Sequence, residues 1–231
     1  GTVVIFKHFV VIDEYPDPLI PAQRNVHLIG GYDPGKIGIL QSIPRQHRQI
    51  VGGGVMLRIV QPVGIGEMGI GNTTTSSAVL SVLLDADVDA VTGRGGGITD
   101  QSFLKKKQVV KTAIEVNQPD KNDVIDVLAK VGGFDIAAMC GGFIGAALTR
   151  RPVVIDGFIS AVAALCAYML CPNAVQYFIP SHASYEIGYK LAMDAMNLQP
   201  LFLLGMRLGE GSGCPLAFQV LDAACAILND M

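Results

Sequence analysis

The chain has 231 residues, of which 50% are hydrophobic and 16% are charged, and its formal net charge is −3. That length and composition fit one large domain with a sizeable buried core. A chain with no broad basic field is not expected to bind nucleic acid. Its apolar runs stop short of the roughly 20 residues that a membrane span needs.

The cysteines and histidines do not follow the spacing of metal ligands. The five cysteines are odd in number and include no Cys-x-x-Cys, so we expect free thiols in a reducing cytoplasm rather than disulfides. The four histidines are scattered, so we predict neither a metal site nor a cofactor. We expect no signal peptide, because Gly1–Val11 lacks a basic lead and a cleavage site.

The first 60 residues contain several strand-like runs. Val3–Phe6 predicts a buried strand, and Gly38–Leu40, Ile50–Val51 and Val55–Leu57 indicate further strand. Several prolines and the Gly52–Gly54 run predict irregular structure in the same region.

A glycine-rich loop, Gly64–Ser77, precedes a predicted helix at Ser76–Leu84 and carries the carboxylate of Glu67 among its glycines and hydroxyls. Glycines let the backbone turn with positive φ and approach a ligand, and the N–H groups at a helix start attract anions. No P-loop lysine follows, and the Gly64-x-Gly66-x-x-Gly69 spacing lacks the acid of a dinucleotide site. The loop therefore predicts a phosphate site, with a turn shaped only by packing as the alternative.

The middle of the chain predicts one strand and three helices. Val88–Val91 is expected as a short strand, and Gln101–Val116 as an amphipathic helix with Asp100 near its start. Asp123–Lys130 predicts a short helix. Phe134–Leu148 carries small and apolar residues all round, so we expect a buried, tightly packed helix.

In the last third, strands and helices alternate. The expected strands are Pro152–Phe158, Val175–Ile179 and Leu201–Met206, and the expected helices are Ser160–Met169, Tyr185–Met196 and Leu216–Asn229. This alternation predicts an α/β fold, a mostly parallel open sheet with helices on both faces (Rossmann-like), formed by a single domain over residues 1–231.

Glycine and acid motifs fall where the predicted strands end. They are Gly64–Asn72, Gly93–Gly97, Asp156–Gly157, Ser181–His182 and Gly209–Gly213. Ligands of open α/β sheets bind at the carboxyl ends of the strands. We therefore expect these loops to form one site.

From residue 64 onward these motifs resemble the nicotinate-nucleotide–dimethylbenzimidazole phosphoribosyltransferase family, which builds the lower nucleotide ligand of cobalamin. The matching segments are Gly66–Thr74, Thr92–Gly95, Val131–Ala137, Pro152–Ser160, Ile179–His182 and Arg207–Gly213. The resemblance implies a transferase that moves 5-phosphoribose from nicotinate mononucleotide to 5,6-dimethylbenzimidazole or a related azole base. The products would be α-ribazole 5′-phosphate and nicotinate.

The resemblance also implies roles for particular residues. Glu210 would be the general base that removes the azole N–H proton. Glu67 would be a second catalytic acid, or an acid that holds the glycine loop by accepting backbone N–H bonds. Substrate-binding roles would fall to Met68, Gly69, Gly71, Asn72, Thr73, Lys106, Asp156, Ser181, Leu208 and Gly211.

Two of these residues keep an alternative. Lys106 either reaches a phosphate or is a surface charge, and Asp156 either accepts ribose hydroxyls or forms a turn. Arg94 and Arg207 are expected to hold loop carbonyls or carboxylates rather than substrate. No metal is required, because the nicotinate ring of the mononucleotide is already a cationic leaving group.

The first 60 residues match the family poorly, since Lys7 replaces an acid and Phe9 a glycine. We therefore expect residues 61–231 to form the core, with the family's smaller helical domain reduced or absent. Small-residue faces on Phe134–Leu148 and Ser160–Met169 favour a homodimer. The alternative function is a catalytically silent binding protein for a nucleotide or α-ribazole-type ligand. A kinase-like or NAD-linked enzyme is disfavoured by the missing P-loop lysine and ribose acid.

Overall fold

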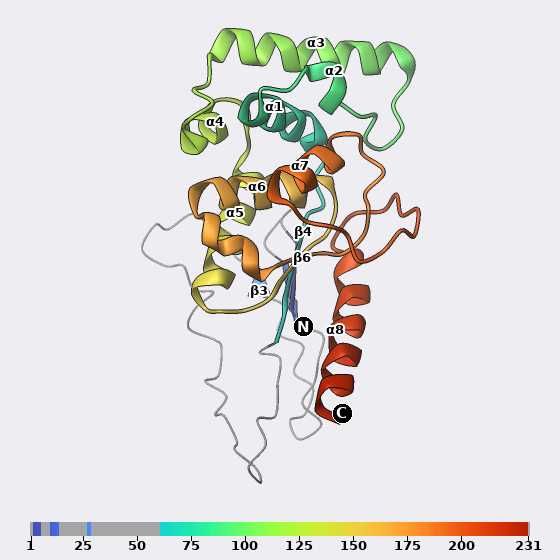
Figure 1. Cartoon of the computed structure of the whole chain (residues 1–231). Coiled ribbons are helices and arrows are strands. Elements are labelled where there is room, and N and C mark those ends of the chain that lie inside the picture. The colour runs from blue at the N-terminus through green and yellow to red at the C-terminus, as the bar shows by residue number, and fades with distance from the viewer. Residues whose placement is uncertain (1, 6–9, 14–26, 29–60, 231) are drawn as a thin grey trace.

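A computed structural model describes residues 2–5, 10–13, 27–28 and 61–230 of the chain (Figure 1). The strands expected at Gly38–Leu40, Ile50–Val51 and Val55–Leu57, and the substituted Lys7 and Phe9, lie outside the described residues.

The described residues form a six-stranded sheet in the order β3-β2-β1-β4-β5-β6. Four strands run parallel: β1 (Thr2–Ile5), β4 (Val63–Gly66), β5 (Val153–Ile155) and β6 (Phe178–Pro180). Two further strands extend the sheet beyond β1: β2 (Val10–Asp13) pairs antiparallel with β1, and β3 (His27–Leu28) pairs antiparallel with β2. In register, Gly64 of β4 lies between Val3 of β1 and Val154 of β5.

Helices cover both faces of the sheet, as the alternating sequence predicted. Residues along β5 point to opposite faces in turn. Val154 packs in a cluster with Cys214 and Phe218 of α8 (Gly213–Asp230), whereas Val153 and Ile155 belong to the main core on the other side. Figure 1 accordingly shows the strands between α8 and the pair α5 (Phe134–Leu148) and α6 (Phe158–Leu170).

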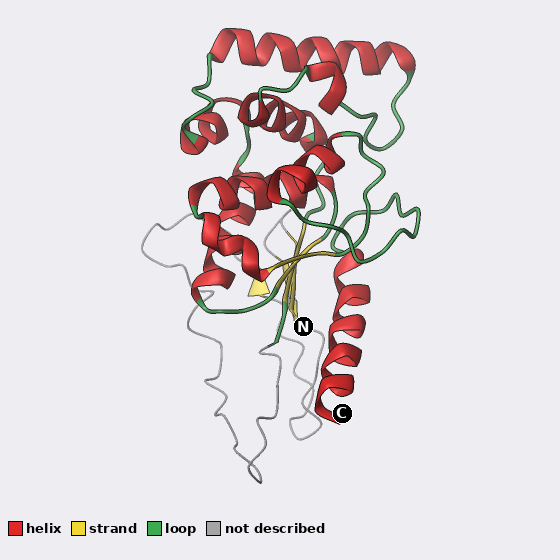
Figure 2. Cartoon of the chain, in the orientation of Figure 1, coloured by secondary structure: helices red, strands yellow, loops and turns green. Residues whose placement is uncertain are grey.

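The remaining helices form a layer beyond the carboxyl ends of the strands (Figure 2). They are α1 (Asn72–Leu84), α2 (Val88–Val91), α3 (Asp100–Asn117), α4 (Val124–Val131) and α7 (Gly188–Met196). The 3₁₀ helix η2 (Pro172–Tyr177) instead packs on α5 and α6 and leads directly into β6. The α1 helix packs against α6, and α2, α3 and α4 pack onto α1. None of the helices in the described ranges is long and apolar enough to cross a bilayer.

The centre of the core is α6. Ten successive residues, from Phe158 to Ala167, are buried. A helix that is apolar all round is suited to such a position because it can contact neighbours on every side. Leu165 of this helix is 1% exposed.

Two predicted strands are not strands. Val88–Val91 is the short helix α2, which begins where the Asp87 carboxylate accepts the N–H of Asp89 at 2.7 Å. Leu201–Met206 is loop, and among the described residues it makes a single bridge, between Phe202 and His182. Leu203 and Leu204 are exposed there, because no neighbouring described strand covers them.

Two further expectations need correction. Gly64 and Gly66 belong to strand β4 rather than to the loop, because their lack of side chains lets α8 and Gly211 pack directly against them. Phe134–Leu148 forms the predicted helix but is not buried all round, since Phe134 is 97% exposed. Only the stripe containing Ile136, Cys140 and Phe143 faces the core.

Candidate active site

The carboxylate of Asp156, at the end of β5, is the polar centre of the site. Its side chain is 2% exposed. Oδ2 accepts the N–H of Gly211 at 2.9 Å, and Oδ1 accepts the N–H of Gly213 at 2.8 Å. One buried carboxylate therefore holds the loop that leads into α8.

Buried serines tie the ends of three neighbouring strands together around Asp156. Ser160 Oγ donates to the carbonyl of Ile65 at 2.6 Å and accepts the Asp156 N–H at 3.2 Å. Ser181 Oγ donates to the Asp156 carbonyl at 3.2 Å and lies 3.1 Å from Nδ1 of His182. The carboxyl ends of β4, β5 and β6 are thus joined by side chains.

Burial determines the direction in which Asp156 and His182 titrate. Loss of solvation raises the pKa of the Asp156 carboxyl, and its two N–H bonds and the nearby His182 oppose that rise. Loss of solvation lowers the pKa of His182, with the charge of Asp156 acting against it.

Glu210 lies on the loop that Asp156 holds. Its side chain is exposed, and its backbone has a left-handed φ of 60°. Gly211 follows with φ 78°, and the N–H of Ser212 closes the turn on the carbonyl of Gly209 at 3.1 Å. Leu208, two residues before Glu210, is exposed as well.

Glu67 is half-buried at the start of the glycine loop. It accepts the N–H of Gly69 at 2.7 Å and a hydrogen bond from the side-chain amide of Asn72. The same amide donates to Asp135 Oδ2 at 3.1 Å. Burial raises the pKa of Glu67, while the bonds from Asn72 and Gly69 lower it and the charges of Asp135 and Asp156 raise it.

The glycine loop turns into α1 at Gly71, which has a φ of 89°. Gly71 has no side chain to cap the helix, so the first turn of α1 begins without a side-chain cap. Met68, Gly69 and Ile70 of this loop are exposed. The loop therefore presents a bare helix start beside exposed apolar side chains.

Lys106 is buried, at 8% exposed, and the surface-charge interpretation is wrong. Its Nζ donates to Thr73 Oγ1 and to the Gly93 carbonyl, both at 2.8 Å. Burial lowers the pKa of Lys106, and the charge of Glu186 opposes this. Lys106 thereby joins α3 to the start of α1 and to the turn after α2.

Arg94 and Arg207 both contact other residues of the protein. Arg94 donates to the Ile98 carbonyl and forms an ion pair with Asp100, as expected. The Arg207 guanidinium lies over the ring of Tyr185, 3.9 Å from its centroid.

Four of the five predicted loops meet at the strand ends. A Cβ on Gly66 would lie 2.5 Å from the Gly211 nitrogen, so the end of β4, where the glycine loop begins, touches the loop before α8. Asp156 and Ser181 join the loops after β5 and β6 to these two. The turn Gly93–Gly97 follows helix α2, and Lys106 links it to α1.

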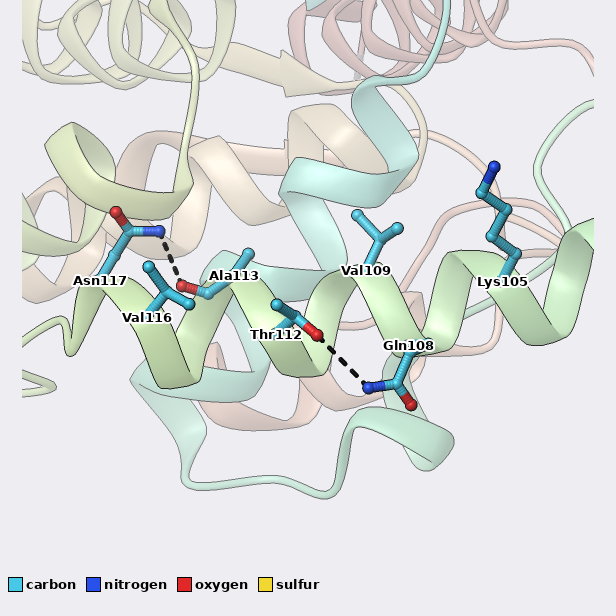
Figure 3. A pocket seen from close by; sticks show the side chains of 7 residues that line it. All are labelled: Lys105, Gln108, Val109, Thr112, Ala113, Val116 and Asn117. Atoms are coloured by element: carbon cyan, nitrogen blue, oxygen red, sulfur yellow. Dashed lines mark hydrogen bonds between the residues drawn. The ribbon is translucent and has the colours of Figure 1, made fainter.

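A groove on α3 lies apart from these loops (Figure 3). Its lining comes from that one helix: Lys105, Gln108, Val109, Thr112, Ala113, Val116 and Asn117. Within the described ranges, no cluster of three or more His, Cys, Asp or Glu side chains could hold a metal ion.

Comparison with known proteins identifies the family. Residues 55–231 match a family model described as "Phosphoribosyltransferase". A nicotinate-nucleotide–dimethylbenzimidazole phosphoribosyltransferase from Clostridium tetani is 55% identical over 168 residues, which cover 73% of this chain and 46% of that protein. The protein of the same name from Ruminiclostridium cellulolyticum is 55% identical over 172 residues, 74% of this chain and 49% of its own.

The chain belongs to the nicotinate-nucleotide–dimethylbenzimidazole phosphoribosyltransferase family.

The fold of the chain also matches a solved structure. The crystal structure of CobT from Thermus thermophilus superposes with a TM-score of 0.69 at 34% identity, covering 72% of this chain and 50% of that one. The chain spans about half the length of the curated relatives it matches. The predicted α/β class is confirmed.

Proposed function

We propose that this phosphoribosyltransferase moves 5-phosphoribose from nicotinate mononucleotide to 5,6-dimethylbenzimidazole or a related azole base. The names of the relatives support these substrates. The setting of Glu210 carries the proposal: an exposed residue on a turn that is hydrogen-bonded to Asp156 at the end of β5 and lies against the end of β4, where the glycine loop begins.

In the proposed reaction one ring nitrogen of the azole attacks C1′ of the ribose. The bond between C1′ and the nicotinate nitrogen breaks, and its electron pair stays on that nitrogen, which neutralises the pyridinium charge. Glu210 takes the N–H proton that the azole loses. The products are α-ribazole 5′-phosphate and nicotinate, so atoms and charges balance without a metal.

The start of α1 is proposed to receive the 5′-phosphate. The helix dipole and the N–H groups beyond Gly71 favour an anion there. Lys106 directs two of its N–H bonds at Thr73 and Gly93, and we propose that its third serves a phosphate oxygen. Ser181 and Gly211 border the same strand ends.

Exposed apolar side chains on the loop after β4 and on the loop before α8 are proposed to receive the flat azole base. They are Met68, Ile70 and Leu208. Glu67, bonded to Gly69 and Asn72, would keep the first of these loops in place and face the ribose.

The assembly of the protein is also proposed. We place the chain in the cytoplasm as a single domain with residues 61–231 as its core, acting as a homodimer. Light scattering should then give twice the chain mass of 24.4 kDa, and a monomer alone would contradict the dimer.

The activity is tested by mixing the purified chain with nicotinate mononucleotide and 5,6-dimethylbenzimidazole. Chromatography follows nicotinate release together with ribotide formation. Base-dependent release establishes the transferase. Binding of the mononucleotide by calorimetry with no release would instead favour the silent binding protein.

A further inference from the structure

Both oxygens of the Asp156 carboxylate face backbone N–H groups of the loop that carries Glu210. The bonds reach Gly211 and Gly213 at 2.9 and 2.8 Å. A carboxylate that accepts N–H bonds forms shorter and stronger hydrogen bonds than a neutral acceptor does. In a position that is 2% exposed, water competes little for them.

The bond to Gly211 constrains Glu210 directly. The peptide unit between Glu210 and Gly211 is planar, so fixing the Gly211 N–H also fixes the plane that contains the Glu210 Cα and carbonyl. The bond to Gly213, two residues further on, prevents rotation of the turn about the first bond. Two anchors on one carboxylate thus set the direction from which the Glu210 side chain leaves the loop.

The Glu210 backbone conformation depends on such anchors. A φ of 60° is one that a residue with a side chain adopts rarely. Such conformations persist where the surroundings over-determine them. A Cβ on Gly213 would meet the side chains of His182, Ser181 and Asp156, so the loop lies directly on the buried polar group with no space between.

We propose that Asp156 is a positioning residue for Glu210, acting through the Gly211 and Gly213 N–H groups rather than by contact with substrate. The inference rests on the proposed function, in which Glu210 is the base. Asp156 then affects the rate although it is buried, because a misplacement of the Glu210 carboxylate by about 1 Å costs roughly 100-fold in rate.

Asp156→Asn tests the inference with almost no change in shape. The amide has one oxygen, so its NH2 group must face either Gly211 or Gly213 N–H and one anchor is lost. We expect kcat to fall by roughly 10- to 100-fold while KM for nicotinate mononucleotide changes by less than about 3-fold. Leu165→Ala is the control, because it weakens the α6 core without touching the loop. Its folded fraction should keep the wild-type kcat.

The double variant Asp156→Asn/Glu210→Gln separates positioning from an independent role. If Asp156 acts through Glu210, the double variant should be no slower than Glu210→Gln alone. Losses that multiply would overturn the inference, because Asp156 would then serve the reaction by another route.

A readout without activity keeps this test distinct from the test of the proposed function. Amide exchange of Gly211 and Gly213, measured by NMR, should be slow in the wild type and faster in Asp156→Asn, whereas in Leu165→Ala it should rise no more than the exchange of the other slow amides does. If Asp156→Asn does not fold, amide exchange in the wild-type protein tests the inference instead. Fast exchange at both Gly211 and Gly213 would overturn it. If exchange behaves as expected but the wild type releases no nicotinate, the proposed function has failed while the anchoring of the loop stands.

Discussion

Gly66 and Gly211 lie against each other, so that a Cβ built on Gly66 would come within 2.5 Å of the Gly211 nitrogen. The end of β4 and the loop after Glu210 therefore approach as bare backbone. Gly66→Ala should push the Glu210 turn outward, lowering stability by about 1–3 kcal/mol and kcat/KM by roughly 100-fold. Thermal unfolding and the nicotinate-release assay measure the two effects.

Gly96→Ala is the matched control for that variant. A Cβ on Gly96 has no described atom within 4 Å, and Gly96 lies in the turn after α2. Both its stability and its activity should remain close to wild type. Wild-type activity in Gly66→Ala would show that the close approach of the two loops is unimportant for the reaction.

Glu210→Gln should lower turnover by about 100-fold or more and leave binding of nicotinate mononucleotide largely intact. The amide keeps the size of the side chain but cannot accept the azole proton. Glu115→Gln, which makes the same charge change at an exposed position of α3, should have no effect. Steady-state kinetics with calorimetry of the mononucleotide checks both statements, and unchanged turnover would remove Glu210 as the base.

Substitution of Gly71 tests the phosphate site. Gly71→Asp and Gly71→Asn share the strain of a φ of 89°, but only aspartate adds a negative charge at the start of α1. Calorimetry should show nicotinate mononucleotide binding roughly 10-fold more weakly to the aspartate variant than to the asparagine variant. Nicotinate riboside, which lacks the phosphate, should bind the two alike. Equal mononucleotide affinities would argue against a phosphate at this helix.

The buried thiols should make the protein sensitive to alkali. Burial raises the pKa of Cys140 from 9.0 to about 12. Because the thiol ionises near its ordinary pKa only when unfolded, its stabilising effect is complete below pH 9 and is lost as pH rises toward 12. The loss is about 1.4 kcal/mol per pH unit across that interval. Denaturant unfolding at several pH values should show a shallower alkaline decline in Cys140→Ala; identical slopes would contradict the expectation.

Gly141 offers a stabilising substitution. It lies exposed inside α5, and a Cβ there has no described atom within 4 Å. Gly141→Ala should raise stability by about 0.5–1 kcal/mol, since alanine loses less backbone entropy than glycine on helix formation. The comparison is Gly132→Ala, whose Cβ would lie 2.6 Å from the Leu128 carbonyl oxygen and should destabilise the fold. Differential scanning calorimetry ranks the two variants.

The local sequence pattern was sufficient to predict most of the helices. Phe134–Leu148 has the predicted bounds, and Gln101–Val116 differs from α3 by one residue at each end. The strand predicted at Val88–Val91 was wrong, because a four-residue segment with three apolar residues fits a strand or a helical turn equally well. The helix is stabilised by the N-terminal cap from Asp87 and by packing against α3 and α7. Leu201–Met206 has strand composition, but a strand also needs a neighbour to pair with, which composition does not contain.

The site was predictable as a set of loops but not as a set of contacts. The rule that ligands bind at strand ends places Asp156 and Gly211 at one edge. Their hydrogen bond joins residues 55 positions apart, and no local pattern encodes it. The bond between Asn72 and Asp135 was missed for the same reason.

Burial of Lys106 did have a signal in the sequence. Its neighbours Lys105 and Lys107 suggest a charged face, yet Lys106 lies four residues before the buried Val110. Residues with that spacing share one side of a helix. The helical period, rather than the cluster of charges, indicated which of the three lysines points inward.

The hydrogen bond from Ser160 to Ile65 closes 95 residues of chain, and the bond from Gly213 to Asp156 closes another 57. Long closures of this kind form slowly, because chain entropy is lost before the contact is gained. Helices such as α3 and α5 can form from local contacts. The turn that carries Glu210 is held by Asp156 of the β5 end and by Gly66 of β4, so it cannot take its final conformation until β4, β5 and β6 are side by side. In refolding, helical signal would return first and a competent turn last, so partly folded chains would have secondary structure but no catalytic centre.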